Sequence, residues 1–387
     1  MPAHTLQVLN AGQIKDAKIE FGDLTVLVGP QATGKSIFLQ LFKLLIDTGA
    51  VLAEMKRYGL DWQKNIGNFL DIYLGEGMRS IWDGKKSSIL KDDAEVDLNE
   101  LVKSQRREKK ERIFFIPAQR VLTLGRGWPR PFTDYSPGDP FVVREFSEKI
   151  RHLMETGMGS GESLFPQTRR LKKAMRDALA NTVFPHFELK VGKQGVQKRF
   201  VLTPRRLHLN KEPVTLPFMV WSAGQREFVP LLLGLYWLLP PTKTPKRGDI
   251  EWAVIEEIEM GLHPRAISSA LLLILDLLSR GYKVCLSTHS PQVLDVVWAL
   301  KMFQEHNAKP DAVLDLFNIK TQRQDLGKMA VEVLKKELRV FYFDPGGKTS
   351  DISNLDPGSD DLAERGWGGL TGFTEHVADV VASVVRD

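Results

Sequence analysis

The sequence is poor in cysteine, because Cys285 is the only one in 387 residues. A single cysteine excludes an internal disulfide and a cysteine-rich metal centre, and it is typical of proteins that work in a reducing cytosol. Long apolar runs are also missing, since those around Leu231–Leu239 and Leu271–Leu278 are too short to span a bilayer. The first residues, Met1–Thr5, lack the charged and then apolar profile of a signal peptide. We therefore expect a cytoplasmic protein that makes no use of a membrane.

Neither a large charge excess nor a repeat is present. The net charge of +5 is a mild basic bias over this length, so it permits contact with nucleic acid without requiring it. Hydrophobic residues at 43% and charged residues at 26% are ordinary for a globular protein with a large core. Heptads do not persist over several turns, which argues against a long coiled-coil arm.

The strongest motif is a phosphate-binding loop of the form G-x-x-x-x-G-K-S. It consists of Gly29, Pro30, Gln31, Ala32, Thr33, Gly34, Lys35 and Ser36. An apolar run at 24–28 predicts a buried strand before the loop, and residues 37–46 predict a helix after it, which is the context that this motif requires. Backbone N–H groups of the loop can face phosphate oxygens, Lys35 adds a positive charge, and the Ser36 hydroxyl can ligate magnesium. The sequence therefore predicts a nucleoside triphosphate site.

Two consecutive carboxylates follow a second apolar run. Residues 252–255 predict a buried strand that ends in Glu256 and Glu257. Because successive side chains of a strand point to opposite sides, one carboxylate can approach the magnesium ion while the other orients or deprotonates a water. We assign Glu256 to the metal and Glu257 to the water.

Two more predicted strands deliver polar residues to the same sheet edge. Residues 283–288 lead to His289, which can contact the γ-phosphate or the attacking water. Residues 113–116 lead to Gln119 and Arg120, and either side chain could reach the nucleotide or its metal. The alternative for Gln119 and Arg120, that they are ordinary loop residues, remains open.

A further anion-binding segment is predicted at the start of a helix. Ser222, Ala223, Gly224 and Gln225 precede the apolar run that ends at Leu239. Unpaired N–H groups and the positive end of the helix dipole would face an anion there. A serine N-cap is commonplace, so the segment gains its weight from its order between the phosphate loop and the paired glutamates.

In this order the motifs resemble those of the ATP-binding-cassette (ABC) class of P-loop ATPases, in the branch that holds the SMC, RecF and OLD proteins. Residues 29–36 are similar to Walker A, 222–225 to the signature, and 255–257 to Walker B with Glu256 in place of aspartate. His289 is similar to the switch histidine and Gln119 to the Q-loop glutamine. The resemblance implies an α/β ATPase head with a mixed sheet, a P-loop and flanking helices. It implies ATP and Mg²⁺ as ligands and Glu257 as the catalytic base.

The resemblance also implies an assembly. In this class two heads enclose two nucleotides, and each site pairs the Walker motifs of one subunit with the signature of the other. A chain with one set of motifs would act as a head-to-head dimer or as a higher oligomer of dimers. Hydrolysis would be slow and would serve as a switch.

The chain divides into four predicted parts. An insertion separates two parts of the ATPase, with helical residues from Phe141 to about Thr182 and then an antiparallel meander. The predicted strands of the meander are Phe187–Val191, Arg199–Leu202 and Leu207–Leu209. The boundaries are 1–124 for the Walker A lobe, 125–218 for the insertion, 219–345 for the remaining ATPase motifs and 346–387 for a C-terminal tail.

The resemblance carries an expectation about the role. The segment after His289 offers no carboxylate set for a metal-dependent nuclease, whereas an OLD-type chain would continue there into a TOPRIM nuclease. An effector would then be a separate polypeptide. The layout is most similar to the stand-alone ATPases of the PARIS anti-phage defence system, the AriA family. That family implies an oligomeric scaffold that holds a TOPRIM-type toxin until a phage protein is sensed.

Two alternatives remain. A RecF-like DNA-binding repair ATPase would use the basic segments at 103–112, 169–176 and 193–206. A nucleotide-dependent scaffold with negligible hydrolysis would use the same site without turnover.

Overall fold

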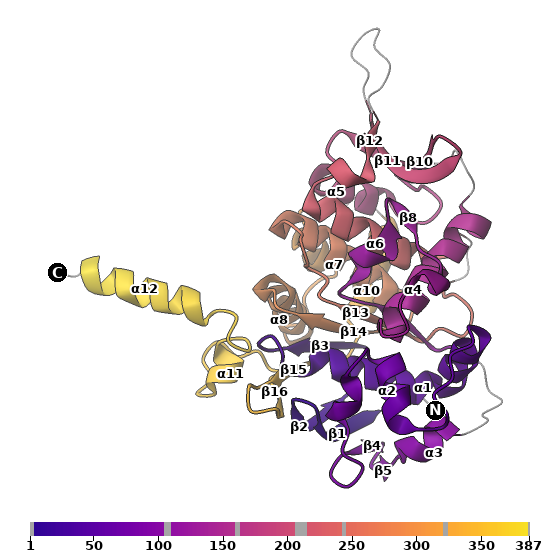
Figure 1. The fold of residues 1–387 in the computed structure, drawn as a ribbon. Coiled ribbons are helices and arrows are strands. Elements are labelled where there is room, and N and C mark those ends of the chain that lie inside the picture. Colours follow the sequence, from indigo (N-terminus) through magenta and orange to yellow (C-terminus); the bar gives the residue numbers. More distant parts are fainter. Residues whose placement is uncertain are drawn as a thin grey trace.

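A six-stranded mixed sheet lies at the centre of the computed structural model, which describes residues 4–103, 110–158, 163–205, 215–241, 245–319 and 324–385 (Figure 1). The strand order is β16-β15-β3-β14-β13-β6, and only β16 runs antiparallel to its neighbour. The strands are β3 (Leu24–Val28), β6 (Ile113–Ile116), β13 (Trp252–Glu256), β14 (Lys283–Thr288), β15 (Leu338–Phe343) and β16 (Thr349–Asp351). Every residue of β3, β6 and β13 is buried, as expected for parallel strands that are covered on both faces. The predicted α/β fold with a mixed sheet is confirmed.

One face of this sheet packs against helices. Val26, Phe114 and Ala253 point to this side and share a core with the apolar positions of the helices. The helices are α5 (Lys173–Thr182), α6 (Ala223–Leu238), α7 (Pro264–Ser279), α8 (Pro291–Glu305), α9 (Asp311–Asp315) and α10 (Gln324–Val333).

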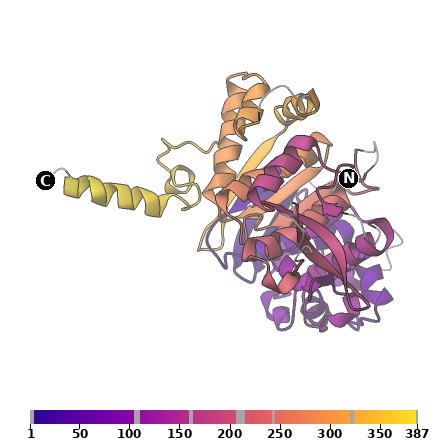
Figure 2. The ribbon, with the colours of Figure 1, turned by 90° about the horizontal axis from the view of Figure 1, so that it is seen from above.

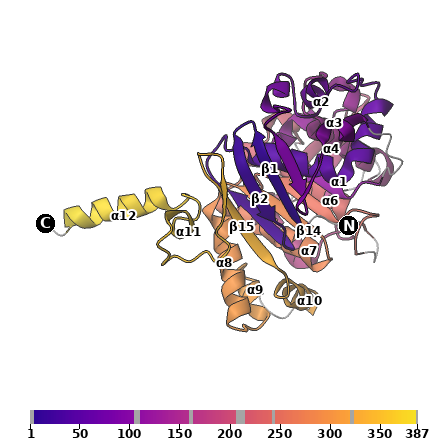
Figure 3. The same cartoon turned by 90° about the horizontal axis from the view of Figure 1, so that it is seen from below.

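The other face packs against the P-loop helix α1 (Lys35–Arg57) and an antiparallel sheet of order β2-β1-β4-β5 (Figure 3). Trp252 and Cys285 point to this side, where the Trp252 ring meets Phe21 and Phe42 edge-on. Cys285 is fully buried, and burial raises the pKa of its thiol. The remaining elements of this lobe are β1 (Thr5–Ala11), β2 (Ile14–Glu20), β4 (Ser88–Lys91), β5 (Ala94–Glu95), α2 (Ile66–Tyr73) and α3 (Leu98–Lys103).

Among the described residues, α1 is the one helix that is long and apolar enough to cross a membrane, with a mean hydropathy of 1.6. In the structure 61% of that apolar window is buried inside the protein. Core helices of globular proteins pass the same test, so this helix is weak evidence for a membrane.

Residues between the two ATPase parts form helices and a second antiparallel sheet, as expected. Helix α4 (Phe141–His152) contributes Val142 to the core around α1 and Phe146 to the core around α6, so it packs against both. The sheet has the order β12-β11-β10-β9. Its strands are β9 (Ser163–Phe165), β10 (Phe187–Gln194), β11 (Gln197–Pro204) and β12 (Leu216–Pro217), and the small hairpin β7 (Leu124–Gly125) and β8 (Trp128–Pro129) lies upstream. The predicted strand Leu207–Leu209 lies outside the described residues.

The C-terminal segment first packs on the body and then leaves it. Ile352, Leu355 and Trp367 are buried, and the short helix α11 (Leu362–Arg365) lies among them in sequence. Helix α12 (Gly372–Val385) then projects away from the rest of the molecule (Figures 1 and 2). The apolar side chains of α12 that the structure describes are exposed, including Phe373 and Val384.

Candidate functional site

The loop between β3 and α1 has the geometry that its glycines allow. Gly29 has a φ of 143°, and a Cβ there would lie 2.2 Å from the carbonyl oxygen of Phe343. Gly34 has a φ of 97°, and a Cβ there would lie 2.5 Å from Ile14 Cγ1. Helix α1 begins immediately after Gly34, and no side chain caps it, so its first N–H groups are free for an anion.

Lys35 lies inside this loop. Its ammonium group donates to the carbonyl oxygens of Gly29 at 2.8 Å and Pro30 at 2.7 Å, and to the Thr33 hydroxyl at 3.3 Å. Burial lowers the pKa of Lys35 to about 8, although the carboxylates of Glu257 and Glu259 oppose this change. The loop is open to solvent at its tip, where the exposed residues are Pro30, Gln31 and Ala32.

Glu256 is buried at the end of β13 beside Ser36. One carboxylate oxygen, Oε2, accepts a hydrogen bond from the Ala118 amide at 3.1 Å, whereas Oε1 has no hydrogen-bond partner of ordinary geometry. Burial raises the pKa of Glu256, and the Ser36 side chain and the Ala118 amide partly oppose the rise. A buried carboxylate oxygen without a partner, next to a serine hydroxyl, fits Mg²⁺, which takes few protein ligands and shares the rest with phosphate oxygens.

Coordination of Mg²⁺ by both protein and phosphate agrees with the scarcity of clustered metal-ligand side chains. In the part of the chain that the structure describes, no three His, Cys, Asp or Glu side chains gather into a metal site. Ser36 and Glu256 would therefore hold the ion together with a phosphate.

Glu257 and His289 meet at the same edge of the sheet. Strands β13 and β14 are parallel neighbours with Glu256 opposite Ser287, so the residues that follow them come together. Glu257 Oε1 lies 3.7 Å from His289 Nε2. Burial and the charge of Lys35 lower the pKa of His289, although Glu257 and Glu259 oppose them. A neutral imidazole at neutral pH can orient the Glu257 carboxylate or a water.

Glu259 fixes the backbone next to His289, a role that the sequence did not indicate. Its carboxylate accepts hydrogen bonds from the Thr288 hydroxyl at 3.0 Å and from the backbone N–H of His289. The only signal was its position two residues after the paired glutamates. His263 is the N-cap of α7, where Nδ1 accepts from the backbone amide of Arg265.

Ser222 begins helix α6 through a capping box with Gln225. The backbone N–H of Gln225 donates to the Ser222 hydroxyl at 3.3 Å. Ser222 and Ala223 are exposed, and Gly224 packs on Gly261, where a Cβ would lie 2.9 Å from the carbonyl oxygen. Helix α6 covers the face of the sheet opposite α1. Within the described ranges no hydrogen bond or ion pair joins this segment to Lys35, Glu257 or His289. The predicted groups Lys35, Glu257 and His289 therefore act on one another within one chain, whereas the signature segment makes no hydrogen bond or ion pair with them among the described residues.

The loop after β6 places its two candidates differently. The Gln119 side chain is exposed, so its role at the nucleotide stays a prediction. Arg120 is completely buried, and its guanidinium faces backbone carbonyls at the end of β13 and in α6, not the phosphate loop.

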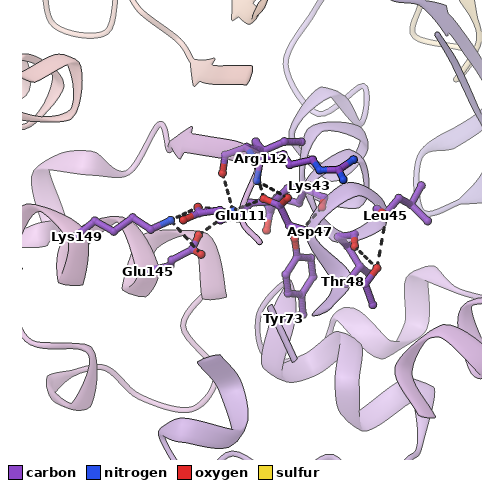
Figure 4. Close-up of polar contacts among 12 residues, drawn as sticks. Lys43, Leu45, Asp47, Thr48, Tyr73, Glu111, Arg112, Glu145 and Lys149 are labelled. Atoms are coloured by element: carbon purple, nitrogen blue, oxygen red, sulfur yellow. Dashed lines mark hydrogen bonds and ion pairs between the residues drawn. The ribbon is translucent and has the colours of Figure 1, made fainter. Parts of the chain in front are cut away.

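A buried ion network joins α1 to β6 and α4 (Figure 4). Lys43 Nζ lies 3.1–3.2 Å from carboxylates of Asp47, Glu111 and Glu145, and Lys149 contacts Glu111 and Glu145 in turn. Burial alone would lower the pKa of Lys43, but the three carboxylates outweigh it and raise the pKa well above its usual value. Asp47, where α1 kinks, also accepts from the amides of residues 112 and 113 at the start of β6.

The basic segments are only partly available to a polyanion. Arg170 is buried and donates to the carbonyl oxygens of Tyr236 and Leu239, and Lys172 pairs with Asp276 at 2.7 Å. Of the basic segment 169–176, which the repair alternative would use, these two residues are therefore engaged within the protein by α6 and α7. Of the other segments, 104–109 and residue 206 lie outside the described residues, whereas Lys193 and Lys198 on the β10–β11 hairpin are exposed.

Comparison with known proteins adds a family. The sequence pattern of the AAA_21 family, described as "AAA domain, putative AbiEii toxin, Type IV TA system", matches residues 24–295. No curated protein matches this chain.

Several solved structures are similar at low identity. An SMC head bound to the C-terminal winged-helix domain of ScpA covers 91% of this chain and 97% of its own, with a TM-score of 0.37 and 9% identity. The dimeric bacterial ABC transporter cassette MJ0796 covers 89% and 98%, with a TM-score of 0.35 and 11% identity. The SMC head domain from Thermotoga maritima covers 76% and 92%, with a TM-score of 0.30 and 12% identity. Scores this low carry no argument about function.

Proposed function

Because the chain belongs to the AAA_21 family of P-loop ATPase domains, we propose that it binds ATP with Mg²⁺ and hydrolyses ATP slowly, as a conformational switch. One observation supports this most strongly. Lys35, Ser36, Glu256, Glu257 and His289 converge at the carboxyl ends of three adjacent parallel strands, β3, β14 and β13.

Each group has a distinct task in this proposal. The free N–H groups of α1 and the Lys35 ammonium would hold the phosphates. Ser36 and Glu256 would hold Mg²⁺, which when bound neutralises charge on the phosphate oxygens. Glu257 would accept a proton from the attacking water, and His289 would orient that carboxylate across the 3.7 Å that separates them.

Ser222 is exposed, and among the described residues no hydrogen bond joins it to Lys35, Glu257 or His289, which supports a site completed by a second copy of the chain. The exposed N-terminus of α6 is suited to a phosphate held by a partner subunit, because the positive end of the helix dipole lies there. We therefore propose a head-to-head dimer or a higher oligomer of dimers.

The family description names a toxin of a toxin–antitoxin system, which favours a role in such a two-component defence. We propose that the ATPase is an oligomeric scaffold and sensor, similar to the AriA family. It would control a separate nuclease or toxin effector, for which a TOPRIM-type enzyme is the expected class, in response to a phage protein. Co-purification of the tagged chain with the product of an adjacent gene tests this role. Loss of that product when ATP is added would support control by the switch, and its absence under all nucleotide conditions would contradict it.

The ATPase itself is tested by phosphate release from the purified protein. Lys35→Ala should weaken ATP binding at least about tenfold, since it removes a charge-assisted contact. Glu257→Gln should keep ATP binding, lower turnover about 10²-fold or more, and trap the dimer. Glu95→Gln, at an exposed strand end, is the matched control and should behave as the wild type. Unchanged turnover in Glu257→Gln would overturn the choice of base.

The composite site has its own test. Lys35→Ala and Ser222→Arg should each abolish turnover alone. Mixing the two should restore about a quarter of the wild-type rate, because half of randomly formed dimers are mixed and each contains one complete site of two. A mixture as inactive as its parts would contradict a shared site.

One surface keeps the DNA-binding alternative open. Arg126, Lys193 and Arg199 line a groove of about 710 Å³ beside β10 and β11. Duplex binding that weakens steeply with salt and is lost in Lys193→Glu would favour a repair ATPase. Binding that is absent at low salt would exclude this role.

A further inference from the structure

Arg120 is one of the largest fully buried side chains in the protein and lies directly after the exposed Gln119. Its guanidinium donates three hydrogen bonds, each to a backbone carbonyl oxygen. The acceptors are Glu256 at 2.9 Å, Glu257 at 3.0 Å and Glu227 at 3.3 Å. Because each of these hydrogen bonds ends on the main chain, Arg120 fixes the positions of the backbone there.

Two of the three carbonyls, those of Glu256 and Glu257, belong to a segment with an unusual backbone conformation. Glu257 has a φ of 44°, in the left-handed region that a residue with a side chain rarely adopts. Its amide donates to the Ser287 carbonyl oxygen at 2.9 Å, which fixes one side of the peptide. Arg120 fixes the other side. Strained conformations persist only where the surroundings over-determine them, and they cluster at functional sites.

The loop that carries Arg120 also forms hydrogen bonds with Glu256, the residue before Glu257. The Ala118 amide donates to the Glu256 side chain at 3.1 Å, while Arg120 holds the Glu256 carbonyl. Glu256 is thus held at both ends by residues two positions apart. The third acceptor, Glu227, lies in the first turns of α6, the helix that Ser222 begins. Arg120 therefore connects the end of β13 to the signature helix.

We propose that Arg120 is a positioning residue for ATP hydrolysis. It holds the backbone of Glu257 so that the carboxylate faces His289, and it couples this conformation to α6, which serves the site of the partner subunit. The inference rests on the proposed ATPase function. A lysine cannot replace the arginine, because one ammonium group cannot present the planar fork that reaches three separate carbonyls.

The same fold supplies a matched control. Arg144 on α4 is also buried, and it donates to the carbonyl oxygen of Ile72 at 2.7 Å. Its guanidinium lies over the Phe132 ring, and among the described residues no hydrogen bond or ion pair joins it to the catalytic groups. A purely structural role for Arg120 predicts that Arg120→Met and Arg144→Met behave alike.

The experiment compares Arg120→Met, Arg120→Lys and Arg144→Met in the full-length chain, with thermal unfolding, affinity for a fluorescent ATP analogue and kcat measured for each. We expect both Arg120 variants to bind the analogue within about twofold of the wild type, with kcat at least about tenfold lower. Arg144→Met should lose stability without a selective loss of kcat. Arg120→Lys keeps the buried charge and serves as the folded variant if Arg120→Met does not fold.

A double mutant separates positioning from a general weakening of the site. If Arg120 acts through Glu257, Arg120→Lys should not lower the residual turnover of Glu257→Gln any further. A further tenfold loss in the double mutant, or equal kcat in the Arg120 and Arg144 variants, would overturn the proposal. If the wild type shows no turnover that depends on Lys35, the proposed ATPase function itself is overturned. If the wild type and the Arg120 variants are equally active, only the proposal for Arg120 is overturned.

Discussion

At the scale of single residues, the site depends on the positive charge of Lys35, which burial makes easier to lose. The pKa of Lys35 is lowered to about 8, so in the free protein this ammonium loses its proton not far above neutral pH. The phosphates of ATP need the protonated form. Above pH 8 a proton must therefore be taken up on binding.

We expect ATP affinity to fall about tenfold per pH unit above roughly pH 8, whereas below that pH it should change little. Titration of a fluorescent analogue between pH 7 and 9.5 measures this dependence, with Lys35→Ala as the control that removes it. Constant affinity over that range in the wild type would show that Lys35 stays charged.

Arg120 and Arg170 show where prediction from single residues ends. Arginine is mostly exposed in proteins, so a sequence offers no reason to bury either one. Both are buried because backbone carbonyls at the ends of secondary-structure elements lack a regular hydrogen-bond donor. Arg120 donates to such carbonyls at the end of β13, and Arg170 donates to those at the end of α6. Such demands arise only after the chain has folded.

At the scale of elements, several strands were predictable from the sequence, whereas the buried ion network was not. Residues 24–28 and 113–116 are unbroken apolar runs next to turn residues, and they form β3 and β6 with those bounds. Helix α1 continues to Arg57, although Asp47, Thr48 and Gly49 interrupt its apolar pattern. Asp47 lies at a kink in α1, with a φ of −108° and a ψ of 22°, and there its carboxylate pairs with Lys43 and accepts from the amides at the start of β6.

This network should matter for stability more than for catalysis. Lys43→Met removes the cation that pairs with the fully buried Asp47 and leaves Glu111 and Glu145 paired with Lys149, so we expect a loss of about 3–5 kcal/mol in the free energy of unfolding. Urea denaturation measures the loss. Lys18→Met, which breaks the exposed pair with Asp93, is the control and should cost less than about 1 kcal/mol. Similar losses in the two variants would mean that the buried network adds nothing.

At the scale of the whole molecule, the C-terminal segment has two parts of different importance. Ile352, Leu355 and Trp367 are buried against the body, whereas every described side chain of α12 is exposed. Ending the chain after residue 371 should shift the melting temperature by less than about 2 °C, because surface changes alter stability little. Ending it after residue 351 removes Ile352, Leu355 and Trp367 and should lower the melting temperature clearly. A large shift in the first truncation would mean that α12 packs against a surface of the protein in solution.

The single cysteine makes this protein a convenient subject for spectroscopy. Cys285 lies in the middle of the central sheet, fully buried, with its thiol held in the unreactive protonated form. A thiol-directed dye should therefore ignore the native chain and label only a cysteine placed on the surface, for example at the exposed hairpin tip in Val196→Cys. Slow labelling of Cys285 itself would then report the rate at which the sheet opens. The thiol of Cys285 would thus measure unfolding, and a dye at Val196→Cys would measure the approach of two subunits.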